Sequence, residues 1–227
     1  MKKQLIIGLV LVGVLAACKK DKDNNDSEVA GLMAFHLVSD QPSIGVSLSG
    51  NNLPGSPYSY LGYTGYYANI FPGTRSINST AGSSTTLSTS SYDFMAGEYY
   101  SLFIVGANGV YRHIVVEDDY DSLTATAGRS YIRYINAIPD SLLTEIVIGE
   151  PGGNLNFTAP YGLVSDFQSV TSGSVTISVG ANSLQDTTRT ITLEEKKAYT
   201  ILLSGQRGAT NTDQQVQIRF IENGRIE

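Results

Sequence analysis

Two copies of one residue pattern follow each other along this sequence, with a period of about 100 residues from residue 30 onward. Six segments of the first copy recur in the second copy in the same order. Chance similarity between two strand-rich segments is the alternative, but it does not explain why all six matches keep one order. The repeat therefore predicts two tandem domains, residues 30–126 and 127–227, with a short polar boundary at residues 121–129. The matched segments are 34–38 with 132–136, 46–50 with 145–149, 61–62 with 161–162, 67–73 with 167–173, 98–106 with 197–205, and 113–118 with 217–222.

Each copy has the residue pattern of short β-strands. Strict alternation of apolar and polar residues in segment 175–179 places Val175, Ile177 and Val179 on one buried face. Leu202 breaks a similar alternation later in the second copy, which indicates a strand buried on both faces.

About seven such runs in about 100 residues, with frequent turns, are typical of an immunoglobulin-like sandwich. The Ser/Thr-rich segment 73–91 is interpreted, from its counterpart in the second copy, as strands 74–79 and 85–90 around a turn at Gly82. The predicted fold class is all-β, with two tandem immunoglobulin-like β-sandwich domains and no long helix after residue 30. Three pairs of matched residues are expected on the inner faces of the two sandwiches: Val46/Ile146, Ile77/Ile177 and Phe103/Leu202.

The N-terminus has the features of an export signal. Lys2 and Lys3 precede an apolar stretch at residues 5–17, and Cys18 follows two alanines. This arrangement resembles the lipobox of bacterial lipoproteins, in which the cysteine is lipidated and becomes the first residue of the mature chain. An ordinary signal peptide or a membrane helix is the alternative, but a spanning helix needs about 20 apolar residues. We predict a signal peptide at 1–17, lipidation at Cys18 and a polar tether at 18–29.

The second copy carries a family resemblance. Residues 131–140 and 197–205 look like the opening strand and turn, and a closing strand, of the bacterial domain-of-unknown-function family numbered 4397. The first copy departs from the pattern in its turn at 39–42 but keeps residues 96–100. The resemblance implies tandem β-sandwiches on envelope proteins and names no activity.

The tether resembles the surface-export signals of Bacteroidota-type lipoproteins, because Lys19 and Lys20 are followed by an acidic run. We therefore expect a lipid-anchored outer-membrane protein that faces the exterior, held at the membrane by its covalent lipid.

Charge and cysteine content exclude several partners. The chain has 15 basic and 21 acidic residues, and removal of residues 1–17 takes away only Lys2 and Lys3. Such an acidic chain lacks the cationic surface that nucleic acid requires. A single cysteine excludes a disulfide framework and a thiolate zinc site. No cofactor is predicted.

Four carboxylates, Glu117, Asp118, Asp119 and Asp121, gather near the domain boundary. They are candidate Ca²⁺ ligands, since Ca²⁺ prefers oxygen ligands. A solvated turn between the domains is the alternative.

A tyrosine-rich segment, residues 56–71, is the candidate binding surface. Tyrosine offers a rigid apolar ring with a polar tip, which suits sugars and protein partners. Tyr67 aligns with Phe167, which indicates that part of the segment serves the core. A binding surface would leave at least three of four side chains exposed in one patch: Tyr58, Tyr60, Tyr63 and Tyr66.

Other chemistry-bearing residues are few. The two histidines, His36 and His113, lie in predicted strands without the third ligand that a metal site needs. No nucleophile elbow is present, so we predict that the protein is not an enzyme. Three Asp-Ser/Thr sites resemble a short O-glycosylation acceptor motif, with acceptors at Ser122, Ser141 and Thr187.

These observations predict a surface-exposed, lipid-anchored, non-catalytic binding or adhesion protein of the bacterial envelope, with an unknown protein or glycan partner. A structural or accessory subunit of an envelope complex is the second hypothesis. A glycan-binding accessory protein is the third.

Overall fold

The computed structural model describes residues 29–82, 85–140, 142–182 and 184–227. The predicted signal peptide, Cys18 and most of the tether lie outside these residues. Nearly all described secondary structure is β-strand, which confirms the predicted all-β fold class. Residues of the first copy form β1 (Ala30–His36), β2 (Ser43–Leu48), β3 (Asn51–Asn52), β4 (Tyr58–Ser59), β5 (Ala68–Ile70), β6 (Gly73–Ala81), β7 (Thr85–Phe94), β8 (Tyr99–Ala107) and β9 (Val110–Glu117). Residues of the second copy form β10 (Arg129–Ala137), β11 (Thr144–Glu150), β12 (Gly153–Ala159), β13 (Gln168–Thr171), β14 (Gly173–Ala181), β15 (Leu184–Leu193), β16 (Lys197–Ser204), the short 3₁₀ helix η1 (Thr212–Gln214) and β17 (Gln217–Arg225).

Each copy is a sandwich of two sheets, and the two sandwiches have the same topology. In domain 1 the sheet β5-β1-β8-β9 packs against the sheet β3-β2-β6-β7, in which β4 also pairs with β2. We call the first the inner sheet, because it faces the other domain, and the second the outer sheet. Domain 2 repeats this order with β13-β10-β16-β17 and β12-β11-β14-β15. In both domains the first strand runs parallel to the strand that precedes the last one. The shared topology supports duplication of one domain, and the predicted strands around Gly82 are present as β6 and β7.

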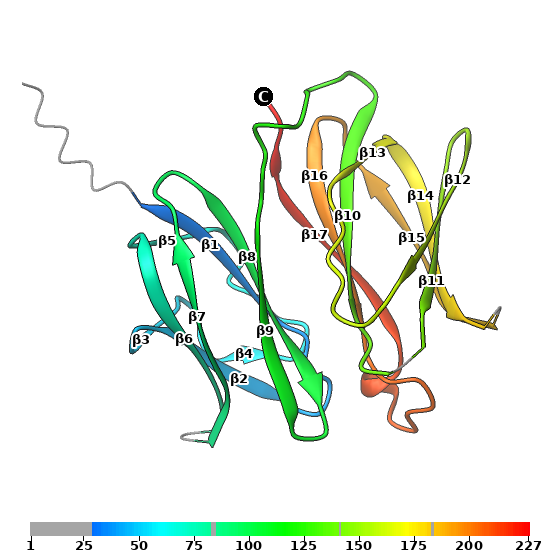
Figure 1. Cartoon of the computed structure of the whole chain (residues 1–227). Helices are drawn as coiled ribbons and strands as arrows, with labels where there is room; N and C mark the ends of the chain where they lie inside the picture. The colour runs from blue at the N-terminus through cyan, green and yellow to red at the C-terminus, as the bar shows by residue number, and fades with distance from the viewer. Residues whose placement is uncertain (1–28, 83–84, 141, 183) are drawn as a thin grey trace, which may run out of the picture.

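The four sheets form one stack, with the two inner sheets facing each other in the middle (Figure 1). Three apolar clusters fill the three spaces of this stack. One lies within each sandwich, and the third lies between the inner sheets. The alternation predicted for β14 is confirmed, because Val175, Ile177 and Val179 are buried in the sandwich core of domain 2.

Two of the three predicted inner-face pairs lie where we expected them. Val46 and Ile77 are in the core of domain 1, and Ile146 and Ile177 are in the core of domain 2. The prediction for Phe103/Leu202 is wrong. Both side chains are buried, but they lie in the cluster between the domains because β8 and β16 are covered on both faces.

The strand register corrects the sequence alignment of the two copies at the last strand. Ile104 pairs with His113 in domain 1, and Leu203 pairs with Ile218 in domain 2. His113 therefore corresponds to Ile218 rather than to Gln217. A slip of one residue moves a side chain to the other face of its sheet. The correction accordingly places His113 over the sandwich core instead of on the opposite face.

Gly205 is expected to be essential for the turn that follows β16. Its φ is +111°, and a Cβ at this position would lie 2.2 Å from the carbonyl oxygen of Gln215. Replacing Gly205 with Ala should lower the free energy of unfolding by about 2 kcal/mol, because a strained φ and a backbone clash would be combined. Urea denaturation followed by tyrosine fluorescence would measure the loss. Gly224→Ala, where a Cβ would meet nothing within 4 Å, is the control, and equal effects of the two variants would contradict the prediction.

Candidate functional site

The contact between the two inner sheets, here called the seam, has an apolar part and a polar part. Phe35 of β1 stacks on Phe103 of β8 with ring centroids 4.9 Å apart, and Tyr63 stacks on the other side of Phe35 at 5.5 Å. Burial of one large apolar side chain contributes about 1.5–3 kcal/mol. Separating the domains would expose the whole apolar part, so the seam holds the two sandwiches in one fixed arrangement. Its buried residues are Met33, Phe35, Leu37, Leu61, Phe103, Val105, Ile135, Ala137, Leu202 and Ile221.

The polar part of the seam is centred on an ion pair between the domains. Arg133 of β10 binds Asp118, which follows β9, and the two side chains are 3% and 0% exposed. The guanidinium also donates to Ser101 Oγ at 2.7 Å and to Thr200 Oγ1 at 2.9 Å. Its Cζ atom lies over the ring of Phe167, 4.6 Å from the ring centre. Arg133 is thus bonded on both sides of the seam, which compensates for the large cost of burying its charge.

Tyrosine hydroxyl groups extend this network toward one end of the seam. Tyr67 donates to the Asp118 carboxylate and lies 2.5 Å, hydroxyl to hydroxyl, from Tyr120. Burial and the neighbouring Asp118 carboxylate raise the pKa of Tyr67 far above its usual value. The hydroxyl of Tyr67 therefore stays protonated and acts as a donor to Asp118.

The network is asymmetric even though the domains are copies. Strand register matches Arg133 with Met33 and Asp118 with Asn223. Each member of the ion pair thus comes from a different copy, and the equivalent position in the other copy holds a neutral residue. The ion pair consequently favours the packing of domain 1 on domain 2 over the packing of two identical copies, since each copy supplies only one of the two charges.

The structure does not bring the four boundary carboxylates together. Asp118 is buried in the seam, whereas Glu117, Asp119 and Asp121 are exposed. Successive side chains of an extended segment point in opposite directions, which separates the buried Asp118 from its two exposed neighbours Glu117 and Asp119. Within the described part of the chain, no group of three or more His, Cys, Asp or Glu residues is placed to hold a metal.

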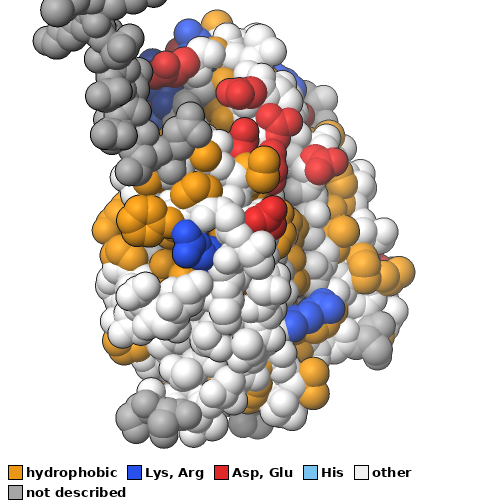
Figure 2. All heavy atoms as spheres, turned by 60° about the vertical axis from the view of Figure 1, so that its left-hand side comes forward, with side chains coloured by type: hydrophobic (Ala, Val, Ile, Leu, Met, Phe, Trp, Pro, Cys, Tyr) orange, Lys and Arg blue, Asp and Glu red, His pale blue; other side chains and the backbone are white. Residues whose placement is uncertain are grey.

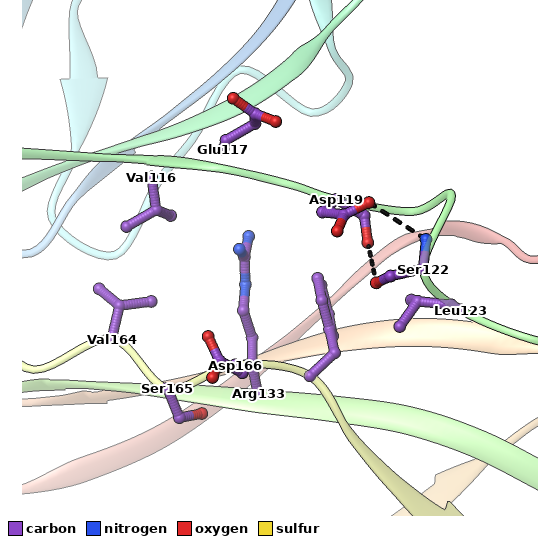
Figure 3. A pocket seen from close by; sticks show the side chains of 10 residues that line it. Val116, Glu117, Asp119, Ser122, Leu123, Arg133, Val164, Ser165 and Asp166 are labelled. Atoms are coloured by element: carbon purple, nitrogen blue, oxygen red, sulfur yellow. Dashed lines mark hydrogen bonds between the residues drawn. The ribbon is translucent and has the colours of Figure 1, made fainter.

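A pocket of about 360 Å³ opens beside Arg133, at the edge of the seam. Figure 3 shows Val116 and Val164 facing each other across it, with the Arg133 side chain extending between the domains. Asp119 accepts a hydrogen bond from the backbone nitrogen of Ser122, which fixes the turn at the mouth of this pocket.

The tyrosine-rich segment does not form the exposed patch that we predicted. Tyr58 is buried in the core of domain 1, and burial raises its pKa to about 12. Tyr60 and Tyr63 are half-buried against the seam, where Tyr60 bonds Ser204 of domain 2 at 2.9 Å. Of the four, only Tyr66 is substantially exposed. The rings of Tyr58, Tyr60 and Tyr63 are therefore used for contacts within the molecule.

The two histidines have structural roles. His36 Nε2 donates to the carbonyl oxygen of Gln41 at 2.9 Å, because Nδ1 accepts from the backbone nitrogen of Val38. His113 bonds Ser90 and the fully buried Ser79. Burial lowers the pKa of each ring to about 4. Neutral imidazoles with buried partners are not arranged to activate a nucleophile for an external substrate.

The O-glycosylation candidates occupy different environments. Ser122 is exposed, and its hydroxyl donates to the carbonyl oxygen of Asp119. Thr187 is half-buried on β15. Ser141 lies outside the described residues. Modification at these sites stays a prediction.

Three pockets lie along the seam between the two domains. Besides the pocket at Arg133, one of about 550 Å³ is lined by Tyr67, Tyr99 and Tyr120 at the end where β1 begins. A third, of about 410 Å³, lies at the opposite end and includes Asp40 and Arg219 in its lining. All three are lined by residues of both domains, as is common for ligand sites.

A hollow away from the seam lies on domain 1. It has a volume of about 280 Å³ and is lined in part by Leu53, Ile70 and Phe71. Figure 2 shows hydrophobic side chains gathered on the left flank of the molecule, beside a basic group. At the end of domain 1 where β1 begins, the exposed large apolar side chains are Tyr66, Phe71, Met95 and Tyr99.

The residues that organise the seam were not predicted as site residues with this role. Arg133 and Thr200 lie in matched segments of the two copies and were assigned no role, and Asp118 was predicted as a Ca²⁺ ligand rather than as the partner of an arginine. A charged residue inside the apolar run at 132–135 was the one signal that could have identified a buried ion pair.

No helix among the described residues is both long and apolar enough to cross a membrane. None of the curated proteins matches this chain. Solved structures that resemble it include candidate cell adhesion proteins from three Bacteroides species. The one from Bacteroides ovatus is 7% identical with a TM-score of 0.29, covering 88% of this chain and 99% of that one. The one from Bacteroides uniformis is 8% identical with a TM-score of 0.28, covering 86% and 97%. The one from Bacteroides eggerthii is 10% identical with a TM-score of 0.26, covering 87% and 96%.

Similarity this low bears on neither the ligand nor the activity of this chain. The model of a protein family is a stronger match. The domain of unknown function DUF4397 matches residues 30–146 and again residues 130–225, which confirms the resemblance noted in the sequence. This chain therefore belongs to the DUF4397 family, with two tandem copies of the domain.

Proposed function

We propose that this protein is a lipid-anchored, non-catalytic binding protein of the bacterial envelope, displayed on the outer membrane and facing the exterior. The observation that carries the proposal is the seam, which fixes two sandwiches side by side and places three hollows between them. A binding protein needs such a rigid surface, because ordering flexible parts on association weakens binding. Anchoring rests on the export signal and on Cys18.

The buried titratable groups named here are engaged within the fold, which supports the non-catalytic part of this proposal. Both histidines are neutral and hold neighbouring backbone or serine groups. The buried Asp118 carboxylate is occupied by Arg133, Ser101 and Tyr67. These groups stabilise the fold and are not poised for proton transfer.

A structural or accessory subunit of an envelope complex is the second candidate. The observation that favours it is the apolar end of domain 1, where Phe71 is 68% exposed and Met95 is 58% exposed. Large exposed apolar groups are a feature of surfaces that pack against other proteins.

Replacing Cys18 with Ser should abolish incorporation of labelled palmitate into the full-length chain expressed in a Gram-negative host. The thiol is the acceptor of the lipid in this proposal, and a serine hydroxyl does not replace it. Fluorography of the immunoprecipitated protein would measure the label, and its mass would show whether residues 1–17 are retained. Lys20→Ala, which keeps the cysteine, is the matched control. Label that persists in Cys18→Ser would refute lipid anchoring at this residue.

A further inference from the structure

The strand β12 lies at an edge of the outer sheet of domain 2 and is paired on one side only. Its seven residues, Gly153–Ala159, pair with β11, and no described strand pairs with its other side. Figure 1 shows β12 at the rim of domain 2 that lies away from domain 1. The unpaired side of an edge strand presents a row of backbone N–H and C=O groups, which is a template for another strand.

The register shows which residues of β12 turn these backbone groups outward. Gly153 closes a turn with Glu150, so its N–H points toward β11. Along an antiparallel strand the direction of hydrogen bonding alternates from one residue to the next, as does the direction of the side chain. The backbone groups of Asn154, Asn156 and Thr158 therefore point away from β11. The side chains of these three residues are exposed.

The same edge is interrupted in domain 1, where a loop bonds the middle of β2. The backbone nitrogen of Leu53 donates to the carbonyl oxygen of Val46 at 2.9 Å, and the backbone nitrogen of Val46 donates to Ser56 Oγ at 2.8 Å. This loop also contains Pro54 and Pro57, which have no N–H to offer. Proline and irregular backbone at an edge prevent pairing with another chain. Domain 1 is therefore closed to a further strand at the edge that domain 2 leaves open.

The other long edge strands meet in pairs within their own sandwich. β7 contacts β9, where Ser90 bonds His113 at 2.8 Å. β15 contacts β17, where the Arg189 guanidinium donates to the carbonyl oxygen of Ile218 at 2.7 Å. The remaining edge strands are shorter than β12, since β13 has four residues, β5 has three, and β3 and β4 have two each. Among the described strands, β12 is thus the longest edge that is not joined to another edge in this way.

The residues of β12 do not protect it from pairing. Edge strands are usually protected by charged side chains, by proline or by a bulge. The sequence of β12 is GNLNFTA, which has neither charge nor proline, and its register with β11 has no break. Because no charge on β12 favours a charged partner, the partner that fits this edge is an uncharged extended strand.

A second copy of β12 supplies such a strand and matches the first along its whole length. In an antiparallel pair centred on Asn156, this residue lies opposite its own copy, and Asn154 lies opposite Thr158. On the other face, Leu155 lies opposite Phe157. Both of these side chains are only partly buried against the core of domain 2, so each would cover part of the other. Polar residues thus meet polar ones, apolar residues meet apolar ones, and about six hydrogen bonds form, two for each of three residue pairs.

We propose that two copies of this protein form a dimer in which β12 pairs antiparallel with its counterpart, around a two-fold axis at Asn156. The two outer sheets of domain 2 then make one continuous sheet across the dimer. Such an interface is isologous, because the same surface of each copy takes part. β12 lines none of the three pockets along the seam, so the dimer leaves those pockets free and is independent of the proposed binding function.

Charge substitutions at the two-fold axis test this dimer. Residues 19–227, which include the whole described fold, should be dimeric at micromolar concentration by analytical ultracentrifugation. Asn156→Lys and Asn156→Asp each place two like charges opposite one another, so each variant should dimerise at least about tenfold more weakly than the original protein. An equal mixture of the two variants should recover the dimer, because a lysine then faces an aspartate. Circular dichroism should show an unchanged fold in both variants, since residue 156 is exposed.

Thr192→Lys is the matched control. It adds the same charge at an exposed residue of β15, the opposite edge of the same sheet, and should leave the dissociation constant unchanged. The proposal is overturned if the original protein stays monomeric, if the charged variants at residue 156 dimerise as the original does, or if Thr192→Lys weakens the dimer as much as Asn156→Lys. A mixture of Asn156→Lys and Asn156→Asp that stays monomeric would also overturn it, since these charges would then not face each other.

Discussion

Lowering the pH from 7 to 4.5 should destabilise the folded protein by several kcal/mol. His36 is fully buried, and His113 is half-buried and bonded to two serine hydroxyls. Burial lowers the pKa of both rings from 6.5 to about 4, while the hydrogen bond to the Gln41 carbonyl oxygen and then the neighbouring Asp40 carboxylate oppose part of this shift at His36. In the unfolded chain both rings regain an ordinary pKa and take up protons as the pH falls below about 6.5.

The sign and size of the effect follow from proton binding. Well above pH 6.5 both rings are neutral in the folded and in the unfolded state, so burying them costs no free energy of deprotonation. As the pH falls toward 4, the unfolded chain binds more protons and stability is lost, with no further loss once the folded rings also titrate. Each pKa unit corresponds to about 1.4 kcal/mol, which limits the loss to about 3 kcal/mol for each histidine. His113 contributes less than this limit because water reaches part of its ring. Urea denaturation at a series of pH values would measure the slope.

The second copy supplies the control for this experiment. Domain 2 has Ile218 in place of His113 and Val179 in place of Ser79. The double variant Ser79→Val/His113→Ile should therefore fold with an apolar contact here and lose part of the acid sensitivity. A free energy of unfolding that stays constant between pH 7 and 4.5 would contradict the assignment of both histidines.

The sandwiches were accessible from sequence because their signals are local. Alternation in β14 marks a strand with one face in a core, and the matched order of segments marks the duplication. The seam was not accessible, because nothing local distinguishes a strand face that packs on its own sandwich from one that packs on another domain. Phe103 illustrates this difficulty, since its burial was predicted correctly and its cluster was not. Leu202 was the one local signal, because it is an apolar residue at a position where the alternation of its strand predicts a polar one.

The candidate sites failed for a related reason. Tyrosines that exceed the needs of one sandwich suggested an external partner, but the partner of Tyr60 and Tyr63 is the neighbouring domain. The acidic run suggested a cation, and its buried member Asp118 does bind one, the guanidinium of Arg133. In both cases the residue types indicated the kind of contact. Tandem duplication then made that contact internal to the chain.

Replacing Asp118 with Asn should be the most damaging single change in the seam. The variant keeps the shape of the side chain but leaves the Arg133 charge buried without a counter-ion. Removal of one partner of a buried ion pair costs about 3–5 kcal/mol. The hydroxyl groups of Ser101 and Tyr67, which now donate to the carboxylate, would bond a weaker acceptor. Thermal and urea denaturation of residues 19–227 would measure the loss.

The two copies again provide the matched control. Asn223 occupies the place of Asp118 in domain 2, and Met33 occupies the place of Arg133 in domain 1. The double variant Asp118→Asn/Arg133→Met would give both domains the neutral residues that one copy already carries. It should recover most of the stability lost by Asp118→Asn alone, since a well-packed neutral replacement of a buried ion pair is often nearly neutral. A double-mutant cycle would then yield a coupling energy of several kcal/mol between the two residues. A coupling energy near zero would show that Arg133 finds water or another acceptor when Asp118 is lost, and that the ion pair does not hold the domains together.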